Sequence, residues 1–182
     1  GDRGEETLDE SATGAGDFLA VLARDWEAAA EPAASDRTRV AFLRTGIVLA
    51  RHGGALKKQL PLFKLGLGGR FGSGRQYQSW ITLTDHVRAT TFLLDAPVDG
   101  PVNLTAPNPV TNAEFTKTLA AVLKRPAIVP IPSFGPKLLL GGELVDHLLL
   151  SGQRVVPAAL QRAGFQFRHP ELRGALEAVL AK

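Results

Sequence analysis

Apolar positions along the chain follow helical spacing in some stretches and form short continuous runs in others. Between residues 17 and 30 they recur every three to four positions behind a capping Asp17, until Pro32 ends the pattern. Further helices are predicted at 54–63, from a cap at Thr84 or Asp85 to about 94, behind the capping box at 111–114, and at 134–150, 157–163 and 170–180. Extended segments are predicted at 39–44, 47–49, 80–83, 100–105 and 128–132. Short strands that alternate with helices indicate an α/β fold, with too few strong strands for a complete doubly wound sheet.

Composition narrows the classes of site and partner. Hydrophobic residues make up 45% and charged residues 21% of the 182 positions, as in ordinary globular domains. The absence of Cys excludes disulfides and cysteine nucleophiles, and the four His lie too far apart in sequence for a zinc site to be expected. The net charge of +3 is scattered, so no nucleic-acid partner is expected. No apolar run approaches ~18 residues, so we expect no membrane partner and a cytoplasmic location.

A glycine-rich stretch at 66–74 invites a phosphate-binding interpretation, because glycines free backbone N–H groups for an anion. The dinucleotide fingerprint G-x-G-x-x-G is not met, since Phe71 stands at the sixth position counted from Gly66. The Walker pattern is not met either, and no strong strand leads directly into the stretch. These residues therefore favour a structural turn with several positive φ angles.

Polar side chains that follow this stretch are candidates for a ligand site. Arg75 offers a planar donor fork for an anion and Gln76 an amide. Trp80 begins a predicted strand, which favours core packing, at most at the edge of a pocket. Asn108 is a candidate polar pocket group, although a role in a turn explains it equally well.

Other residues with ionisable or nucleophilic side chains have structural explanations. Asp85 is better explained as a helix cap than as a catalytic acid. No G-x-S-x-G pattern surrounds any Ser, so no nucleophilic triad is indicated. His52 stands between Arg51 and Gly53 and fits a surface loop better than a general base.

Several stretches together resemble one family, the extended short-chain dehydrogenases, and within it the cell-division-inhibitor-like sugar-nucleotide epimerases. The resemblance is carried by 44–49 with 53–56, by 72–76 with 80–81 and 84–85, and by 103–115. The stretches 148–157 and 163–167 resemble the subfamily's C-terminal domain of unknown function. The resemblance covers nearly the whole chain, and the combination of stretches is specific.

The resemblance implies the C-terminal part of a Rossmann-like fold that lacks the N-terminal dinucleotide-binding strands. Residues 1–50 would be the remainder of the Rossmann domain, 51–132 the substrate lobe with returning Rossmann elements, and 133–182 the helical domain of unknown function. NAD or NADP would be bound mainly upstream of Gly1, an expectation that the absence of Met and of a signal peptide supports. Gly46 and Val48 would approach the nicotinamide, and Arg75, Gln76, Trp80 and Asn108 would border the substrate.

The chain departs from the family's pattern at three places. Typical members carry Tyr-x-x-x-Lys on the helix predicted at 17–30, where this chain has Phe18 and Leu22 and neither a Tyr nor a Lys. The family's phosphate-binding Arg corresponds to Gln78, and the first Asp of an Asp-Asp pair corresponds to Thr84. The catalytic residues therefore stay open.

Three hypotheses follow. The first is an NAD(P)-dependent epimerase or oxidoreductase acting on a nucleotide-sugar-like small molecule, with this chain as its substrate-binding part and inactive alone. The second is a non-catalytic NAD(P)-binding or regulatory protein of the same fold, and the third an unrelated α/β interaction module. An open sheet edge and a bare helix face would leave the chain poorly stable as a monomer and allow a homodimer.

Overall fold

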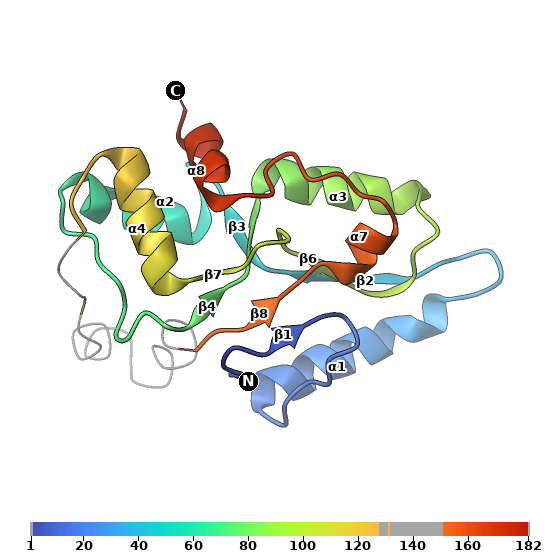
Figure 1. Ribbon diagram of the computed structural model, residues 1–182. Helices are drawn as coiled ribbons and strands as arrows, with labels where there is room; N and C mark the ends of the chain where they lie inside the picture. The colour runs from blue at the N-terminus through green and yellow to red at the C-terminus, as the bar shows by residue number, and fades with distance from the viewer. Residues whose placement is uncertain (1, 128–130, 132–150, 182) are drawn as a thin grey trace.

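Two pairs of parallel strands form the centre of the protein in a computed structural model that describes residues 2–127, 131 and 151–181 (Figure 1). Strand β2 (Ala41–Thr45) pairs with β6 (Gly100–Leu104), and β3 (Ile47–Leu49) pairs with β5 (Trp80–Thr82). The segments predicted at 39–44, 47–49, 80–83 and 100–105 are thus strands with slightly different ends. Parallel strands joined through helices confirm the predicted α/β class.

Gly46 interrupts what would otherwise be one strand and separates β2 from β3. A Cβ atom at this position would lie 2.5 Å from the carbonyl oxygen of Ser79 and 2.8 Å from a methyl carbon of Thr105. Only glycine lets the backbone approach that closely, so Gly46 permits the chain to pass from pairing with β6 to pairing with β5.

Helices cover the strands and bury two apolar clusters. Helix α2 (Gly54–Lys64), α4 (Asn112–Leu123) and α8 (Leu172–Leu180) pack together around Trp80 and Leu119, both fully buried. The second cluster lies between β6, α3 (Leu83–Asp95) and α7 (Ala158–Arg162). Because fully buried side chains dominate the stability of a domain, these clusters fix where the C-terminal residues pack.

Two short strand pairs lie beside this centre. Strand β1 (Thr7–Leu8) pairs in parallel with β8 (Arg154–Val155), and β4 (Tyr77–Gln78) pairs antiparallel with β7 (Val110–Thr111). Figure 1 shows β1 and β8 side by side between β4 and helix α1. The pairing of β1 with β8 joins the N-terminal segment to the part of the chain that follows residue 150.

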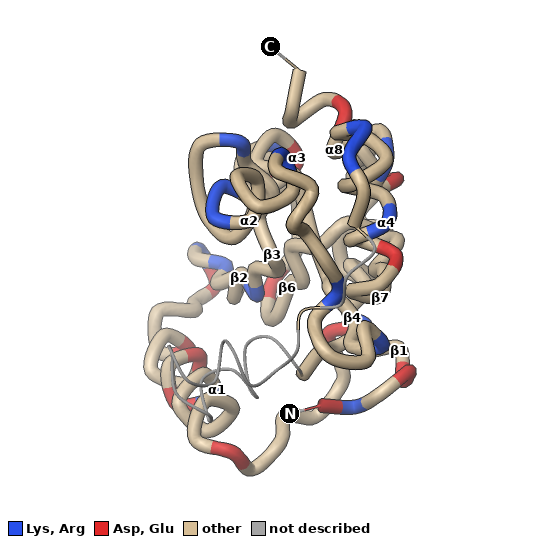
Figure 2. The backbone as a smooth tube through the Cα atoms, turned by 90° about the vertical axis from the view of Figure 1, so that its left-hand side faces the viewer, with Lys and Arg blue, Asp and Glu red and all other residues tan. Residues whose placement is uncertain are grey.

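Helix α1 (Phe18–Ala30) begins at the predicted cap, where the Asp17 carboxylate accepts a hydrogen bond from the Ala20 N–H. A 3-10 turn (Glu31–Ala33) containing Pro32 ends it, as predicted. The apolar face is not buried by the described residues, since Phe18 is 78% and Trp26 79% exposed. Figure 2 shows acidic positions along α1 and the segment before it, on the side opposite α2 and α8.

Some predicted boundaries need correction. Helix α3 is capped by Thr82, whose hydroxyl accepts from the Asp85 N–H, and not by Thr84 or Asp85. The Thr111 cap of α4 is confirmed, as is the end of α7 before Gly164, where φ is +82°. The helix predicted at 134–150 and most of the segment at 128–132 lie outside the described residues.

The glycine-rich stretch is a packing loop. A Cβ at Gly68 would lie 2.5 Å from the ring of Phe63, and Gly66, Gly72 and Gly74 have positive φ angles. The prediction of a structural turn is confirmed. No phosphate cradle is needed to explain these glycines.

Candidate functional site

Ser79 connects the Gly46 turn to the C-terminal strand β8. Its carbonyl oxygen accepts a hydrogen bond of 2.8 Å from the Ile47 N–H. Its hydroxyl donates to the Gln153 carbonyl (2.6 Å) and accepts from the Val155 N–H (2.9 Å). The single side chain of Ser79 thus holds the backbone on both sides of Arg154.

The Arg154 side chain packs on an aromatic ring. Its guanidinium carbon lies 5.4 Å from the centre of the Tyr77 ring, within the range of a cation–π contact. The backbone of Gly152 passes so close to β4 that a Cβ there would overlap the backbone of Tyr77. The segment 152–154 is therefore fitted tightly against Tyr77.

A buried carboxylate fixes the other side of β8. Glu10 is only 9% exposed, and its two oxygens accept from the N–H of Asn103 on β6 (3.1 Å) and from the N–H of Ala159 in the first turn of α7 (3.0 Å). The Asn103 amide in turn donates to the Val156 carbonyl at 3.0 Å. A carboxylate at a helix N-terminus accepts from N–H groups that have no partner within the helix, so Glu10 anchors α7 to the sheet.

A second buried carboxylate, Asp85 on α3, holds the segment before α8. It accepts from the N–H groups of Arg168 (2.9 Å) and His169 (2.8 Å) and from the Arg88 guanidinium (2.8 Å). Asp85 is 1% exposed. It is neither a helix cap nor placed to contact a ligand, and its role is to join the C-terminal segment to α3.

The predicted substrate residues have different surroundings in the described part of the chain. Trp80 is fully buried, which confirms its core role, and its indole N–H donates to the Asn108 carbonyl at 3.1 Å. The Asn108 side chain donates to Glu171 (2.6 Å) and so joins the start of α8 to the loop after β6. Gln76 donates to the Phe71 carbonyl inside the glycine-rich loop, whereas Arg75 is exposed.

The predicted cofactor-side residues lie at the turn between β2 and β3 and within β3. The Gly46 N–H donates to the Leu104 carbonyl at 3.1 Å, and half-buried Val48 packs against the second apolar cluster. Gly46 also contacts Ser79, which holds the strand of Arg154. The turn and β8 are thus connected through one residue.

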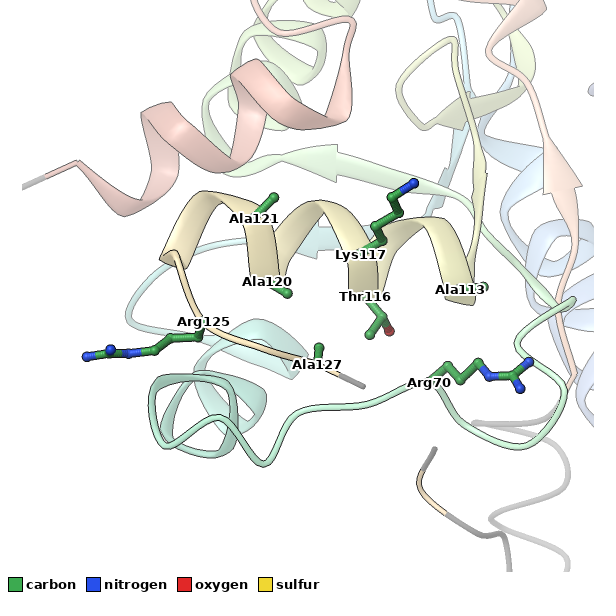
Figure 3. Close-up of a pocket in the computed structure, with 8 residues that line it drawn as sticks. All are labelled: Arg70, Ala113, Thr116, Lys117, Ala120, Ala121, Arg125 and Ala127. Carbon is green, nitrogen blue, oxygen red and sulfur yellow. The ribbon is translucent and has the colours of Figure 1, made fainter. Parts of the chain in front are cut away.

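A separate cavity of about 330 Å³ lies between α4 and the glycine-rich loop (Figure 3). Its lining includes Arg70, Lys117 and Arg125 around small side chains. Figure 3 shows the three basic groups pointing away from one another, and the Arg70 guanidinium donates to the Ser73 carbonyl at 2.7 Å. The basic groups therefore do not form one anion cradle.

Ser79, Glu10, Asp85 and Arg154 were not among the predicted site residues. A single polar residue in an ordinary sequence context carries no signal for a contact that spans 74 to 149 positions. Within the described residues no group of three or more His, Asp or Glu could hold a metal ion. No helix of the described part is long and apolar enough to span a membrane.

The chain is similar to a domain family and to curated proteins of known sequence. Residues 131–179 match the model of a domain of unknown function (DUF1731). The chain is 48% identical over 177 residues to the epimerase family protein MT2273 of Mycobacterium tuberculosis, covering 97% of this chain and 58% of that protein. The chain thus spans a little over half the length of such curated relatives.

Solved structures define the fold more closely. A crystal structure of the human epimerase family protein SDR39U1 with NADPH matches with a TM-score of 0.92 and 39% identity, over 98% of this chain and 61% of that one. A nucleoside-diphosphate sugar epimerase from Corynebacterium glutamicum matches with a TM-score of 0.75 and 38% identity, over 98% of this chain and 34% of that one. The chain has the Rossmann-like fold of the epimerases and extended short-chain dehydrogenases, as predicted, and its homologues are epimerase family proteins.

Proposed function

We propose that this chain forms the substrate-binding, C-terminal part of an NAD(P)-dependent epimerase or oxidoreductase of the extended short-chain dehydrogenase family. The substrate is a small molecule of the nucleotide-sugar type. The observation that carries the proposal is the match of 98% of the chain to a human protein seen with NADPH, at a TM-score of 0.92. The name of the Corynebacterium relative, a nucleoside-diphosphate sugar epimerase, supports the substrate class.

In this proposal the described residues border the cofactor and do not cradle its phosphates. Packing against Phe63 explains Gly68, and positive φ angles explain Gly66, Gly72 and Gly74, so these four glycines do not require a pyrophosphate to explain them. Gly46 follows β2, at the carboxyl end of a parallel strand, where ligands of such sheets bind, and Val48 lies in the next strand, β3. A bound nicotinamide would supply hydride transfer, and residues of this turn would form one wall beside it.

On the substrate side the proposal divides the candidates into two groups. Arg75 is exposed and is available to an anionic group of the substrate. Gln76, Trp80 and Asn108 hold neighbouring loops in place, because the side chain of each donates a hydrogen bond to a backbone carbonyl. The division into parts at 1–50, 51–132 and 133–182 is a further element of the proposal.

A second candidate is a non-catalytic NAD(P)-binding or regulatory protein of the same fold. It is favoured by α1, which has Phe18 and Leu22 and no Tyr or Lys, so that this helix supplies neither a proton donor nor a ribose-binding Lys. Tyr77 is the only tyrosine of the chain, and it packs against Arg154 on β4.

Calorimetric titration with NADPH and NADH tests the proposal. The samples are this chain alone and a chimera in which the N-terminal portion of the M. tuberculosis relative precedes it. Binding by the chimera alone, with turnover of a nucleotide sugar, is the expected result. Binding without turnover of any nucleotide sugar would favour the non-catalytic candidate. Absence of binding by both samples would contradict both candidates, and binding by this chain alone would contradict the upstream location of the cofactor site.

A further inference from the structure

The acidic side chains of the protein gather at one end of the sequence. Residues 1–36 carry ten acidic and two basic side chains, whereas residues 37–127 carry four acidic and thirteen basic ones. Within the described part of the chain a single ion pair joins these two stretches, that of Glu27 with Arg44. Most of the opposite charge on the two stretches is therefore not paired between them.

Helix α1 presents an apolar face that carries an acidic residue. Phe18, Leu22 and Trp26 recur every four positions and are all exposed. Asp25 is exposed too, and its spacing of seven from Phe18 and three from Leu22 places it on the same face. Glu27, which forms the ion pair with β2, projects from the opposite side of the helix. The face is thus apolar and negatively charged, and the described residues do not bury it.

The cavity of about 330 Å³ beside α4, here called the α4 groove, has the complementary character. Its floor is formed by small side chains at helical spacing, Ala113, Thr116 and Ala120. Figure 3 shows Arg70 and Arg125 at opposite ends of this floor, with Lys117 between them. None of these three cations forms an ion pair within the described part of the chain. A row of small side chains lets another helix approach closely, so the groove fits a helix of negative charge.

The two surfaces match in shape and in charge. Large side chains spaced by four residues form a ridge on α1, and helices pack by placing such a ridge into a groove of the neighbouring helix. We propose that α1 of one copy of this chain docks in the α4 groove of a second copy, with Asp25 opposite Lys117. Acidic residues also stand at the two ends of α1, Asp17 and Glu31, as basic residues do at the two ends of the groove. This contact concerns assembly and does not depend on the proposed catalytic function.

The contact must form between copies. Figures 1 and 2 both show α1 and α4 on different sides of the molecule, so a copy does not place its own α1 in its own groove. Each copy carries both surfaces, so two copies can exchange their helices reciprocally in a closed dimer, or further copies can add to an open chain. Opposite charges on the two surfaces favour this orientation over the contact of two α1 helices, whose charges repel.

Disulfide cross-linking gives a direct test, because the chain has no cysteine of its own. Ala29→Cys lies on the apolar face of α1 and Ala121→Cys in the lining of the groove, both at exposed positions. An equal mixture of these two variants, one carrying a size tag, should form a mixed disulfide-linked dimer under mild oxidation. A mixture of Ala29→Cys with Thr91→Cys, an exposed position on α3, is the control and should cross-link far less.

Three results of the cross-linking would overturn the proposal. Equal linking in the control mixture would indicate random collision. Linking of Ala29→Cys only to itself would indicate that two α1 helices meet. Loss of the mixed dimer when Ala29→Cys is placed in the chimera with the N-terminal portion of the M. tuberculosis relative would assign the face of α1 to that portion.

Charge variants test the electrostatic part of the contact. Lys117→Glu should weaken self-association about tenfold in sedimentation equilibrium, roughly 1.4 kcal/mol, because repulsion from Asp25 replaces attraction. Adding Asp25→Lys to the same chain should restore the association. Lys58→Glu, at an exposed position of α2 outside the groove, should leave it unchanged, and added salt should weaken it in the native chain. Equal effects of Lys117→Glu and Lys58→Glu, or an association that salt does not change, would contradict the proposal.

Discussion

The buried carboxylate of Asp85 accepts a hydrogen bond of 2.8 Å from the backbone N–H of His169, 84 positions further along the chain. The same carboxylate accepts from the Arg168 N–H, and Glu10 similarly accepts from the Ala159 N–H. Two acidic side chains from the N-terminal two-thirds therefore hold both ends of the segment 159–169, Glu10 beside β6 and Asp85 on α3. Because these contacts involve buried backbone donors, loss of either carboxylate leaves N–H groups without acceptors.

Asp85→Ala is expected to lower the free energy of unfolding by about 2–4 kcal/mol, since two buried N–H groups and one guanidinium lose their acceptor. Asp85→Asn keeps one carbonyl oxygen and should cost less. Urea denaturation measures the loss, and hydrogen exchange should locate it at residues 165–176. Asp95→Ala, at an exposed position of the same helix, is the control. A loss of similar size in the control, or none at Asp85, would contradict the role of this carboxylate.

The sequence pattern predicted the described helices and the central strands β2, β3, β5 and β6, because each depends on neighbours a few positions away. It did not predict the two-residue strands β1, β4, β7 and β8, which depend on pairing with distant segments. It predicted the Asp17 and Thr111 caps, whose partners lie three residues on. It failed for Asp85, because Thr82 caps the helix instead, and the backbone N–H groups that the Asp85 carboxylate binds lie over eighty positions downstream. Contacts between distant segments leave no local pattern in the sequence. The hydrogen bonds that Glu10 and Ser79 make to distant segments could therefore be found only from the structure.

The candidate site was predictable only in part for the same reason. Trp80 was recognised as a core residue because a strand of large apolar residues is readable from sequence. Arg154 stood in the expected C-terminal stretch, but its unpaired Nε and its contact with Tyr77 depend on how β8 meets β4. The resemblance indicated Gly46 as a cofactor-side residue, whereas the structure adds that the Ser79 carbonyl requires a glycine there.

Gly46→Ala should destabilise the chain by about 1–3 kcal/mol, the usual range for overpacking. The added methyl group would lie 2.5 Å from the backbone oxygen of Ser79, which cannot rotate away as a side chain can. Gly16→Ala is the control, because no heavy atom lies within 4 Å of the added carbon and φ is not positive. Thermal unfolding of both variants checks the prediction, and equal melting temperatures would show that the turn adjusts freely.

Lowering the pH should loosen helix α1 from the sheet. The hydrogen bond from Arg44, at 2.7 Å, holds the pKa of Glu27 below its usual value. A depressed folded-state pKa contributes stability above the unfolded-state pKa, and this contribution is lost as the pH falls through the folded-state pKa. Because both side chains are partly exposed, the effect should stay below about 1 kcal/mol and decrease with salt.

Glu27→Gln provides the matched measurement for that pH effect. The protection of α1 amides against hydrogen exchange, measured relative to the intrinsic rate at each pH, should fall in the native chain as the pH enters the acid range. The Glu27→Gln variant should show the lower protection of α1 already at neutral pH. Lowering the pH should then change its protection less than that of the native chain. Identical pH profiles for the two proteins would mean that the pair with Arg44 does not hold α1.

The exposed face of α1 should make the chain self-associate. Phe18 and Trp26 are each more than three-quarters exposed, and Leu22 is half exposed on the same helix. Apolar patches of this kind promote association in water, so the isolated chain is expected to be a poorly stable monomer. The double variant Phe18→Ser, Trp26→Ser should shift sedimentation toward monomer at equal concentration, whereas Leu94→Ser on α3 tests whether any exposed apolar residue has the same effect. A native chain that is monomeric and unfolds cooperatively at high temperature would contradict this expectation.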